Sequence, residues 1–540
     1  MTDLHCAQAS GPDAELSSNP LLRRLESVPD SVVHLLRDAA SERPEAPAVA
    51  FEEHRLNYAQ YAGIVGALAR RLGKTVRPGD RVVLLMQNTL DLAVATFAVH
   101  ALRAQVVALN PAASRRDLEF MLADAAPVAV VLDERVTPHL AVVRRCLPAA
   151  ALVEAAGGAS FVRLLPEACP LPLALPAHRD LASLQYTGGT TGRAKGVNIL
   201  HRQLAWNLAQ REAWLPTRKG QEVVLCMTPL FHVSAVAMCL HQSVHAQGQL
   251  VIHRRFNAEA VLEAVQTHQV TLLPAVPAVF HDLLRQPSLQ RDAVKSLRAC
   301  YSGAAPLPEQ TLRRFEELTG CPIHEGYGLS EAGPCLAFNP VGMPRKAGTV
   351  GLPVPGGDLQ VVDLGSGTRE VPAGSVGEIR VRGPQVMSGY RNLPLENERA
   401  FRDGWFYTGD LAHRDQDGYI VLHGRRHDVI NVGGFSVYPL EIEKVLRLQP
   451  EVGEAAAFAV QDKRLGEVVH AWVTGAASHP APDADDLMDH CRRELAAYKV
   501  PRRIGIIDSL PRTAVGKLAR NQLAPVPDRT GATQPSEDQA

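Results

Sequence analysis

Hydrophobic residues in the first quarter of the chain follow two alternating patterns. After Ser31, apolar residues recur every three to four positions, which predicts an amphipathic helix with Ser31 at its start. The same spacing predicts further helices at 58–72, 90–104 and 115–125. Short apolar runs predict strands at 48–51, 81–86, 106–109 and 128–132. Strands that alternate with helices are typical of a layered α/β fold.

The pattern changes after Gly351. Short β-branched runs there are separated by Gly, Pro and Asp turns, which predicts a small β-barrel or sheet with strands at 359–362, 378–381 and 419–422. Beyond Gly424 a mixed pattern returns, and Pro439 opens a predicted helix because proline is tolerated in the first helical turn. Further strands are predicted at 456–460, 468–473 and 504–507, with a helix at 483–495.

These patterns predict an α/β protein with two folded domains. We expect a large N-terminal domain of layered α/β subdomains at 26–426, with a β-rich subdomain at about 345–424. A small α+β domain is expected at 427–525. Small and polar residues dominate 1–25 and 526–540, which predicts disordered tails because such segments bury too little apolar surface.

Composition narrows the functional classes. The 540 residues are 46% hydrophobic and 21% charged, as in folded globular proteins. Lys and Arg total 56 against 57 Asp and Glu, so the net charge of −1 offers no basic field, and we expect no nucleic-acid partner. The nine cysteines are scattered and contain no C-x-x-C pair, which favours reduced thiols.

The hydropathy of the chain predicts a cytoplasmic protein. The N-terminus shows no basic start followed by an apolar run, so no signal peptide is expected. The apolar stretch at 92–109 is interrupted by His100 and Arg103, so no transmembrane segment is expected either. Peripheral membrane contact, and the choice between monomer and homodimer, stay open at this stage.

A glycine- and threonine-rich segment, YTGGTTGRAKGV at 186–197, follows an apolar run. Its glycines allow backbone N–H groups to converge on an anion, while its hydroxyls and Lys195 add donors and positive charge. This composition indicates phosphate binding rather than a plain surface loop. It is not a Walker P-loop, because no G-K-[ST] follows, and Gly516-Lys517 is followed by Leu518. The phosphate-binding candidates are Thr187, Gly188, Gly189, Thr190, Thr191 and Lys195.

Six further segments follow in order along the chain: PLFH at 229–232, SGAAP at 302–306, EGYGLSE at 325–331, YTGD at 407–410, the stretch from Gly424-Arg425 through Gly433-Gly434 to PLEIE at 439–443, and PRTAVGK at 511–517. Together with the first segment they resemble the signatures of the acyl-adenylate-forming superfamily, across roughly residues 30 to 525. The resemblance implies an AMP-forming acyl-CoA synthetase. Its reaction converts ATP and a carboxylate into acyl-AMP and pyrophosphate. Coenzyme A then attacks the acyl-AMP to give acyl-CoA and AMP.

The resemblance also implies roles for individual residues. Glu331 would be the Mg²⁺ ligand, and Tyr327 would stack on adenine with Gly303 and Ala304 on its other side. Ser330 replaces the threonine of most relatives and keeps a hydroxyl for phosphate. Asp410 would bind both ribose hydroxyls, and Arg425 would contact ribose and phosphate. Ala305, Gly326 and Gly328 complete the implied nucleotide-binding set.

Near the C-terminus, Lys517 matches the lysine that reaches the α-phosphoryl group in the family. His427 stands where relatives have the Asp or Lys hinge, a departure that leaves the hinge energetics open. The Gly433-Gly434 pair leaves room for a pantetheine arm, as in CoA-using members of the family. A carrier protein would present the same arm, and we expect free CoA as the acceptor because the sequence contains no attached carrier domain.

The acid substrate is also suggested by resemblance. His232 matches a residue that gates the acyl pocket and argues against an amino-acid substrate. The pocket would be lined by Ser234, Val236, Ala237, Gly303, Pro334 and Cys335, a set without Lys or Arg that suits a neutral apolar tail. The segments EGYGLSE at 325–331, GPQVMSGY at 383–390 and CRRELAAYKVP at 491–501 resemble bacterial medium- and long-chain fatty acyl-CoA ligases, and Ser234 stands where hydroxycinnamate-specific relatives commonly have an aromatic residue. The resemblance therefore implies a medium- or long-chain fatty acid. The alternatives are an aryl or hydroxycinnamate acid, a carrier-protein acceptor, and a non-catalytic nucleotide-binding relative.

Overall fold

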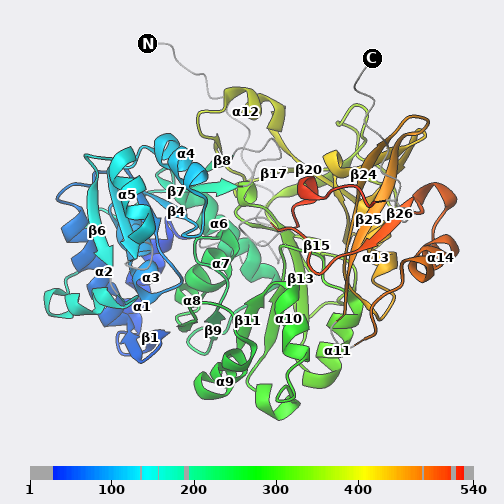
Figure 1. The fold of residues 1–540 in the computed structure, drawn as a ribbon. Coiled ribbons are helices and arrows are strands. Elements are labelled where there is room, and N and C mark those ends of the chain that lie inside the picture. The colour runs from blue at the N-terminus through cyan, green and yellow to red at the C-terminus, as the bar shows by residue number, and fades with distance from the viewer. Residues whose placement is uncertain are drawn as a thin grey trace. The chain divides into compact units, whose positions relative to one another are not determined.

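A computed structural model describes residues 28–133, 137–155, 157–187, 194–476, 479–512 and 518–527. The chain divides into two compact units. The first comprises Met1–Gln360, Arg380–Tyr407 and Asp417–Ile420; the second comprises Val361–Ile379, Thr408–Gln416 and Val421–Ala540. Both units mix helices with sheets, which confirms the predicted α/β class (Figure 1).

The first unit contains a nine-stranded sheet in the order β15-β14-β13-β12-β11-β9-β10-β1-β2. The six strands from β13 to β1 are parallel, whereas β14, β15 and β2 are antiparallel additions at its edges. The bounds are β1 Pro47–Phe51, β2 His54–Asn57, β9 Val223–Cys226, β10 Gln249–Ile252, β11 Leu272–Ala275, β12 Ala299–Ser302, β13 Ile323–Gly328, β14 Cys335–Phe338 and β15 Leu352–Pro353.

A seven-stranded sheet, also in the first unit, has the order β18-β8-β7-β4-β3-β5-β6. Its strands from β7 to β6 are parallel, and β8 and β18 are antiparallel. The bounds are β3 Arg81–Leu85, β4 Gln105–Leu109, β5 Ala129–Asp133, β6 Ala151–Ala155, β7 Leu181–Thr187, β8 Lys195–Leu200 and β18 Gly389–Tyr390.

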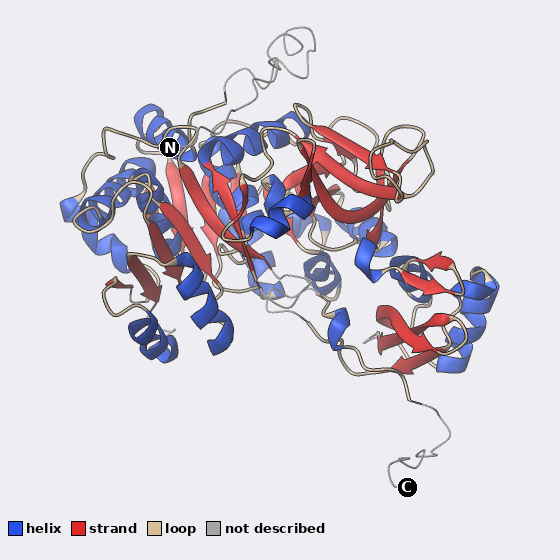
Figure 2. Ribbon diagram, turned by 90° about the horizontal axis from the view of Figure 1, so that it is seen from above, coloured by secondary structure: helices blue, strands red, loops and turns tan. Residues whose placement is uncertain are grey.

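Helices cover the faces of both sheets (Figure 2). Helices α3 and α6 contact strands of both sheets, and every residue of α3 is buried, including its polar residues Asp91, Thr96 and His100. The helices of the first unit are α1 Val32–Glu42, α2 Tyr58–Leu72, α3 Leu90–Ala101, α4 Arg115–Ala125, α5 Thr137–Cys146, α6 His201–Trp214, α7 Val233–Ala235, η4 Val236–His241, α8 Gln242–His245, α9 Ala258–His268, α10 Pro277–Leu284, α11 Glu309–Thr319 and α12 Pro394–Ala400, with short 3₁₀ helices η3 Ser160–Glu167, η5 Arg291–Val294 and η6 Ser330–Ala332.

Local differences from the predicted elements have physical reasons. The helix predicted to reach residue 104 ends at Ala101, because Arg103 adopts a φ of +59°, which no α-helix tolerates. Ser31 lies at the start of α1 as predicted, but its side chain does not cap the helix. Its Oγ lies 2.9 Å from Nδ1 of His34 instead.

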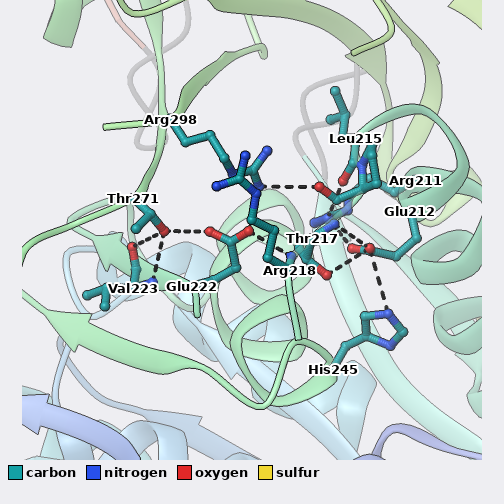
Figure 3. A network of polar contacts seen from close by, with 11 residues as sticks. Arg211, Glu212, Leu215, Thr217, Arg218, Glu222, Val223, His245, Thr271 and Arg298 are labelled. Carbon is teal, nitrogen blue, oxygen red and sulfur yellow. Dashed lines mark hydrogen bonds and ion pairs between the residues drawn. The ribbon is translucent and has the colours of Figure 1, made fainter. Parts of the chain in front are cut away.

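A buried polar network fastens the C-terminal end of α6 to the start of β9 and to β11 (Figure 3). The Glu222 carboxylate accepts hydrogen bonds from Arg298 Nη2 and Thr271 Oγ1, each at 2.5 Å. Arg211, with 1% of its side chain exposed, contacts Glu212 and donates to the carbonyl oxygen of Leu215 at 3.0 Å. Buried charges of this kind persist only when paired, so the network fixes this corner of the unit.

A five-stranded sheet is formed by five later strands. They are β16 Asp358–Val362, β17 Gly377–Arg382, β19 Phe401–Arg402, β20 Trp405–Arg414 and β21 Ile420–Arg425. The second unit holds another sheet in the order β23-β22-β25-β24, with β26 beside β25. Its strands are β22 Ile430–Val432, β23 Phe435–Val437, β24 Val452–Asp462, β25 Gly466–Gly475 and β26 Arg503–Ile506.

Helices α13 Pro439–Leu446 and α14 Ala484–Glu494 pack on this second sheet. Pro439 is the first residue of α13, as predicted, and the Asp483 side chain caps α14 by accepting from the backbone N–H groups of Asp485 and Asp486. The core between helices and sheet includes Ile442, Leu446, Ala471, Val473 and Leu487. Short 3₁₀ helices lie at η7 Arg426–Asp428, η8 Ala497–Lys499 and η9 Arg520–Gln522.

Candidate functional site

Three of the predicted motifs follow parallel strands of the nine-stranded sheet. Strands β9, β12 and β13 end before or within the segments that carry His232, Gly303 and Glu331. Because parallel strands point the same way, their carboxyl ends meet at one edge, where ligands bind in open α/β sheets. The structure therefore gathers these motifs, far apart in sequence, along one edge of the first unit.

Close backbone packing explains two glycines at this edge. A Cβ at Gly328 would lie 1.5 Å from the carbonyl oxygen of Pro334, and a Cβ at Gly326 would lie 2.3 Å from the Phe338 ring. A Cβ at Gly303 would meet nothing closer than 3.5 Å, so the nearby protein does not require that glycine. Ala304 holds a φ of +68°, a strained conformation for alanine that costs about 1 to 3 kcal/mol and is common at binding sites.

The EGYGLSE segment runs from β13 into η6. Tyr327 is buried in β13 opposite Ala337, and Ser330 and Glu331 lie in the 3₁₀ helix that follows. The Tyr390 hydroxyl donates to Oε1 of Glu331 at 2.9 Å. The backbone carbonyl of Glu331 accepts from the N–H of Met387 at 2.7 Å. Two contacts from the 387–390 segment therefore orient the glutamate.

Lys195 lies at the start of β8, opposite Thr187 at the end of β7. Its ammonium donates to Oε2 of Glu396 at 2.6 Å and lies 5.2 Å from the centre of the Tyr390 ring. The hydrogen bond from Lys195 lowers the pKa of Glu396. Gly188, Gly189, Thr190 and Thr191 belong to the segment between these strands and lie outside the described residues.

His232 precedes the single-turn helix α7 and turns its ring toward it. Its Nδ1 lies 2.7 Å from Oγ of Ser234 and accepts from the backbone N–H of Ser234 at 3.3 Å. An accepting Nδ1 places the proton of a neutral ring on Nε2. The adjacent carbonyl of Phe231 accepts from Nε2 of Gln185 at 2.8 Å, which ties this segment to β7.

A small cavity of about 20 Å³ adjoins this segment. Val236 and Ala237, both predicted for the acyl pocket, line it, whereas Ser234, Gly303, Pro334 and Cys335 do not. Cys335 instead packs its Sγ 3.7 Å from Met238 Sδ, and burial raises the pKa of its thiol to about 12. The cavity also has a polar side, described below, that the predicted apolar lining did not include.

The second unit contains the predicted ribose-binding residues. Nε of Arg425 donates to Oδ1 of Asp410 at 2.7 Å, and Nη1 of Arg425 donates to the Thr408 carbonyl at 3.1 Å. The neighbouring Arg426 donates to Glu378 Oε2 at 2.5 Å. The structure therefore brings Asp410 and Arg425 together as a pair, although 14 residues separate them in the chain and the sequence pattern alone does not show the contact.

The two predicted glycines at 433 and 434 have a structural explanation. They form the two-residue loop between β22 and β23, with φ values of +56° and +90°. A two-residue hairpin loop with positive φ at both residues is of type I′, a conformation that glycine adopts most readily. His427 is exposed in η7, with Nε2 at 3.4 Å from Asp428 Oδ1. Lys517 lies outside the described residues.

Sequence reasoning missed Tyr390 and Glu396, which contact Glu331 and Lys195. Tyr390 ends the segment GPQVMSGY at 383–390, which could have drawn attention to it, whereas no sequence signal pointed to Glu396. For metal binding, no group of three or more His, Cys, Asp or Glu side chains that could hold an ion occurs in the described part of the chain. No helix within the described ranges is long and apolar enough to cross a membrane.

Comparisons with known proteins identify the family. Residues 36–391 match the AMP-binding enzyme family, and residues 441–517 match the AMP-binding enzyme C-terminal domain. The first match covers more than half of the chain, so the chain belongs to the AMP-binding enzyme family.

Relatives define the class more closely. A long-chain-fatty-acid–CoA ligase of Bacillus subtilis (strain 168) is 32% identical over 91% of this chain and 93% of its own. An indoleacetate–CoA ligase of Aromatoleum aromaticum is 32% identical over 90% and 96%. The structure of o-succinylbenzoate coenzyme A synthetase from Bacillus subtilis, in complex with ATP and magnesium ion, is 30% identical, with a TM-score of 0.80 over 91% of this chain and 98% of that one.

The chain is therefore an AMP-forming acid–thiol ligase whose substrates are a small carboxylic acid, ATP and coenzyme A. The predicted family, fold class and enzyme class are confirmed. The relatives include both alkyl and aryl acid ligases, so they support acyl- or aryl-CoA ligase activity without selecting the acid.

Proposed function

We propose that this ligase activates a monocarboxylic acid with a neutral tail, with medium- or long-chain fatty acids as the main class. The observation that carries the proposal is the uncharged lining of the cavity beside His232, where Val236 and Ala237 meet aliphatic side chains from β4, β8 and α6 and polar side chains from α3 and β7. None of its described lining residues is Lys or Arg, so a second carboxylate would be desolvated without a partner. The relatedness to a long-chain-fatty-acid–CoA ligase supports the same class.

The remaining residues in this proposal have roles that offset the repulsion between anions during adenylation. A carboxylate must attack the α-phosphorus of ATP, so two anions approach each other and need cations and oriented donors. Lys195 and the hydroxyl of Ser330 would contact phosphate oxygens, and Tyr327 would stack on adenine. Asp410 and Arg425 would bind the ribose. Lys517 would stabilise the transferring phosphoryl group.

Glu331 fits a magnesium ligand in this scheme. Magnesium prefers carboxylate oxygens, and a carboxylate has acceptor capacity on two oxygens. In the structure Tyr390 donates to Oε1, which orients the group without using its full capacity. Bound magnesium would neutralise charge on the ATP phosphates.

Pyrophosphate release tests the proposal. The purified chain is given ATP, Mg²⁺ and a panel of acids, with and without CoA. We expect release with alkyl acids and CoA-dependent appearance of acyl-CoA and AMP. Asp410→Asn serves as a matched variant that keeps size but removes charge, and it should raise the KM for ATP. Activity with dicarboxylates alone would contradict the proposed acid class.

An aryl acid is the second candidate, because the indoleacetate–CoA ligase is as similar in sequence as the fatty-acid ligase is. The same panel separates the two, since coumarate, benzoate or indoleacetate would then exceed every alkyl acid in kcat/KM.

A further inference from the structure

The cavity beside His232 has two chemically different sides. It lies between one face of the seven-stranded sheet and helices α3, α7 and η4. Side chains alternate along strands, so Val106 and Ala108 on β4 share a face, as do Ser183 and Gln185 on β7. The opposite face, with Val107 and Leu184, packs in a separate apolar core.

The first side is apolar. Its residues come from β4, β8, α6 and the 230–237 segment: Val106, Ala108, Ile199, Leu204, Leu230, Val233, Val236 and Ala237. The second side carries hydrogen-bonding groups, which are Thr96 and His100 from α3 and Ser183 and Gln185 from β7. Polar side chains on an inward face of a buried strand are costly unless something bonds to them.

His100 is the most constrained of these groups. It is 1% exposed, and neither ring nitrogen has a hydrogen-bond partner among the described residues. Thr96, by contrast, donates to the Leu92 carbonyl at 2.8 Å, and Gln185 donates to the Phe231 carbonyl at 2.8 Å. A buried imidazole with two unpaired nitrogens beside a cavity lacks the partner that such groups have in folded proteins.

The charge state of His100 decides which partner fits. Burial lowers the pKa of His100 well below its usual range, and His201 and His241 nearby lower it further. A neutral imidazole offers one donor and one acceptor. It therefore suits a hydroxyl or carbonyl group rather than a second carboxylate. A volume of about 20 Å³ holds a group of one or two non-hydrogen atoms, similar to one water molecule.

We propose that His100 is a specificity-determining residue that hydrogen-bonds a hydroxyl or carbonyl group at the far end of the acid's tail. The preferred substrate is then an oxygenated acid, such as an ω-hydroxy or oxo fatty acid, of which only the oxygenated end enters the cavity. This inference rests on the proposed function, because it takes the cavity as the end of the acyl pocket.

Matched pairs of acids test the inference on the wild-type chain. Each pair has the same number of non-hydrogen atoms and differs only in ending with a hydroxyl or a methyl group, over increasing chain lengths. Ring-hydroxyl and ring-methyl aryl acids form one further pair. We expect kcat/KM for pyrophosphate release to favour the hydroxyl member by about tenfold or more, because the methyl member leaves His100 unpaired.

Two variants assign the preference to His100. His100→Leu should reverse the ratio within each pair, while His241→Leu should leave it as in the wild type. His241 is a matched control, since it is also buried and neutral but does not line the cavity. If His100→Leu fails to fold, His100→Phe replaces it, because phenylalanine keeps a flat ring without hydrogen-bonding groups, and it should likewise remove the hydroxyl preference.

The outcomes distinguish a failure of the proposed role of His100 from a failure of the proposed acid class. A wild-type preference for methyl-terminated acids by about fourfold, the value of one buried methylene, would overturn the inference while leaving the ligase proposal intact. It would mean that water occupies the cavity and serves His100. Absence of pyrophosphate release with every monocarboxylic acid would reject the proposed acid class, and the inference with it.

Discussion

Three buried histidines make the stability of the first unit depend on pH. His100 on α3, His201 on α6 and His241 on η4 lie together, with ring centroids 5.0 Å apart for His100 and His201 and 6.3 Å for His100 and His241. Burial lowers the pKa of His201 and of His241 to about 3, and that of His100 well below its usual range. Asp180 opposes the shift at His201 but does not outweigh burial.

The direction of the effect follows from these pKa shifts. The unfolded chain takes up protons on histidine below about pH 6.5, whereas the folded chain keeps these rings neutral to much lower pH. Unfolding therefore binds protons, so the free energy of unfolding falls as pH drops below 6.5. It continues to fall until the folded pKa near 3 is reached.

The size of the pH-dependent change in the free energy of unfolding does not depend on the exact pKa of each folded ring, because the rings stay neutral over the pH range considered. When the pH falls from 7.5 to 5.5, each histidine that stays neutral in the folded chain lowers the free energy of unfolding by about 1.4 kcal/mol. The three histidines together lower it by about 4 kcal/mol. His241→Leu removes one titrating group. It should therefore reduce the pH-dependent loss by about 1.4 kcal/mol, whatever its effect on stability at pH 7.5.

Urea unfolding at several pH values measures this difference. The wild type, His241→Leu and the exposed-site control His479→Leu are compared at pH 7.5, 6.5 and 5.5. The control should follow the wild-type curve. Equal pH-dependent losses in the wild type and His241→Leu would refute the reasoning, because the buried ring would then titrate alike in both states.

Three further predictions follow from contacts and motifs. Glu222→Gln should lower the free energy of unfolding by about 3 to 5 kcal/mol because it removes a buried carboxylate and leaves the partly buried Arg298 without its counter-charge, whereas Glu309→Gln on an exposed helix face should cost less than about 1 kcal/mol in the same denaturation assay. Glu396→Gln should lower the KM for ATP by about two- to fivefold by releasing Lys195 for phosphate, and a higher KM would contradict this. Lys517→Ala should reduce adenylation by about 10²-fold or more while sparing thiolation of supplied acyl-AMP; equal losses in both half-reactions would remove Lys517 from phosphoryl transfer.

Local elements were predictable because local signals define them. Helices α2 and α4 have the predicted bounds, since apolar spacing and capping residues agree at both. Sheet membership was not predictable in this way. The strand predicted at 48–51 is β1, which pairs with β10 of the nine-stranded sheet, while the next predicted strand, β3, joins the other sheet. Such pairings depend on distant residues that no local pattern reports.

The candidate site residues show the same difference: those within contiguous motifs could be selected from the sequence, and those contributed by distant segments could not. Residues in contiguous motifs, such as Glu331 and Lys195, were selected from their spelling, and their nucleotide roles stay predictions. Their contacts Tyr390 and Glu396 come from a distant segment without a chemical signature of its own. His100 was noted only as an interruption of an apolar stretch, because a polar residue in such a stretch does not reveal the cavity beside it.

The pairing of β1 with β10 also affects how the chain folds during synthesis. Val49 pairs with Leu250, so this contact spans about 200 residues and cannot form until both have left the ribosome. Translation at about 5 to 20 residues per second leaves β1 without its parallel neighbour for on the order of 10 seconds or more. During that interval an apolar strand can pair with other nascent chains, so slower synthesis lengthens the time in which such pairing can occur.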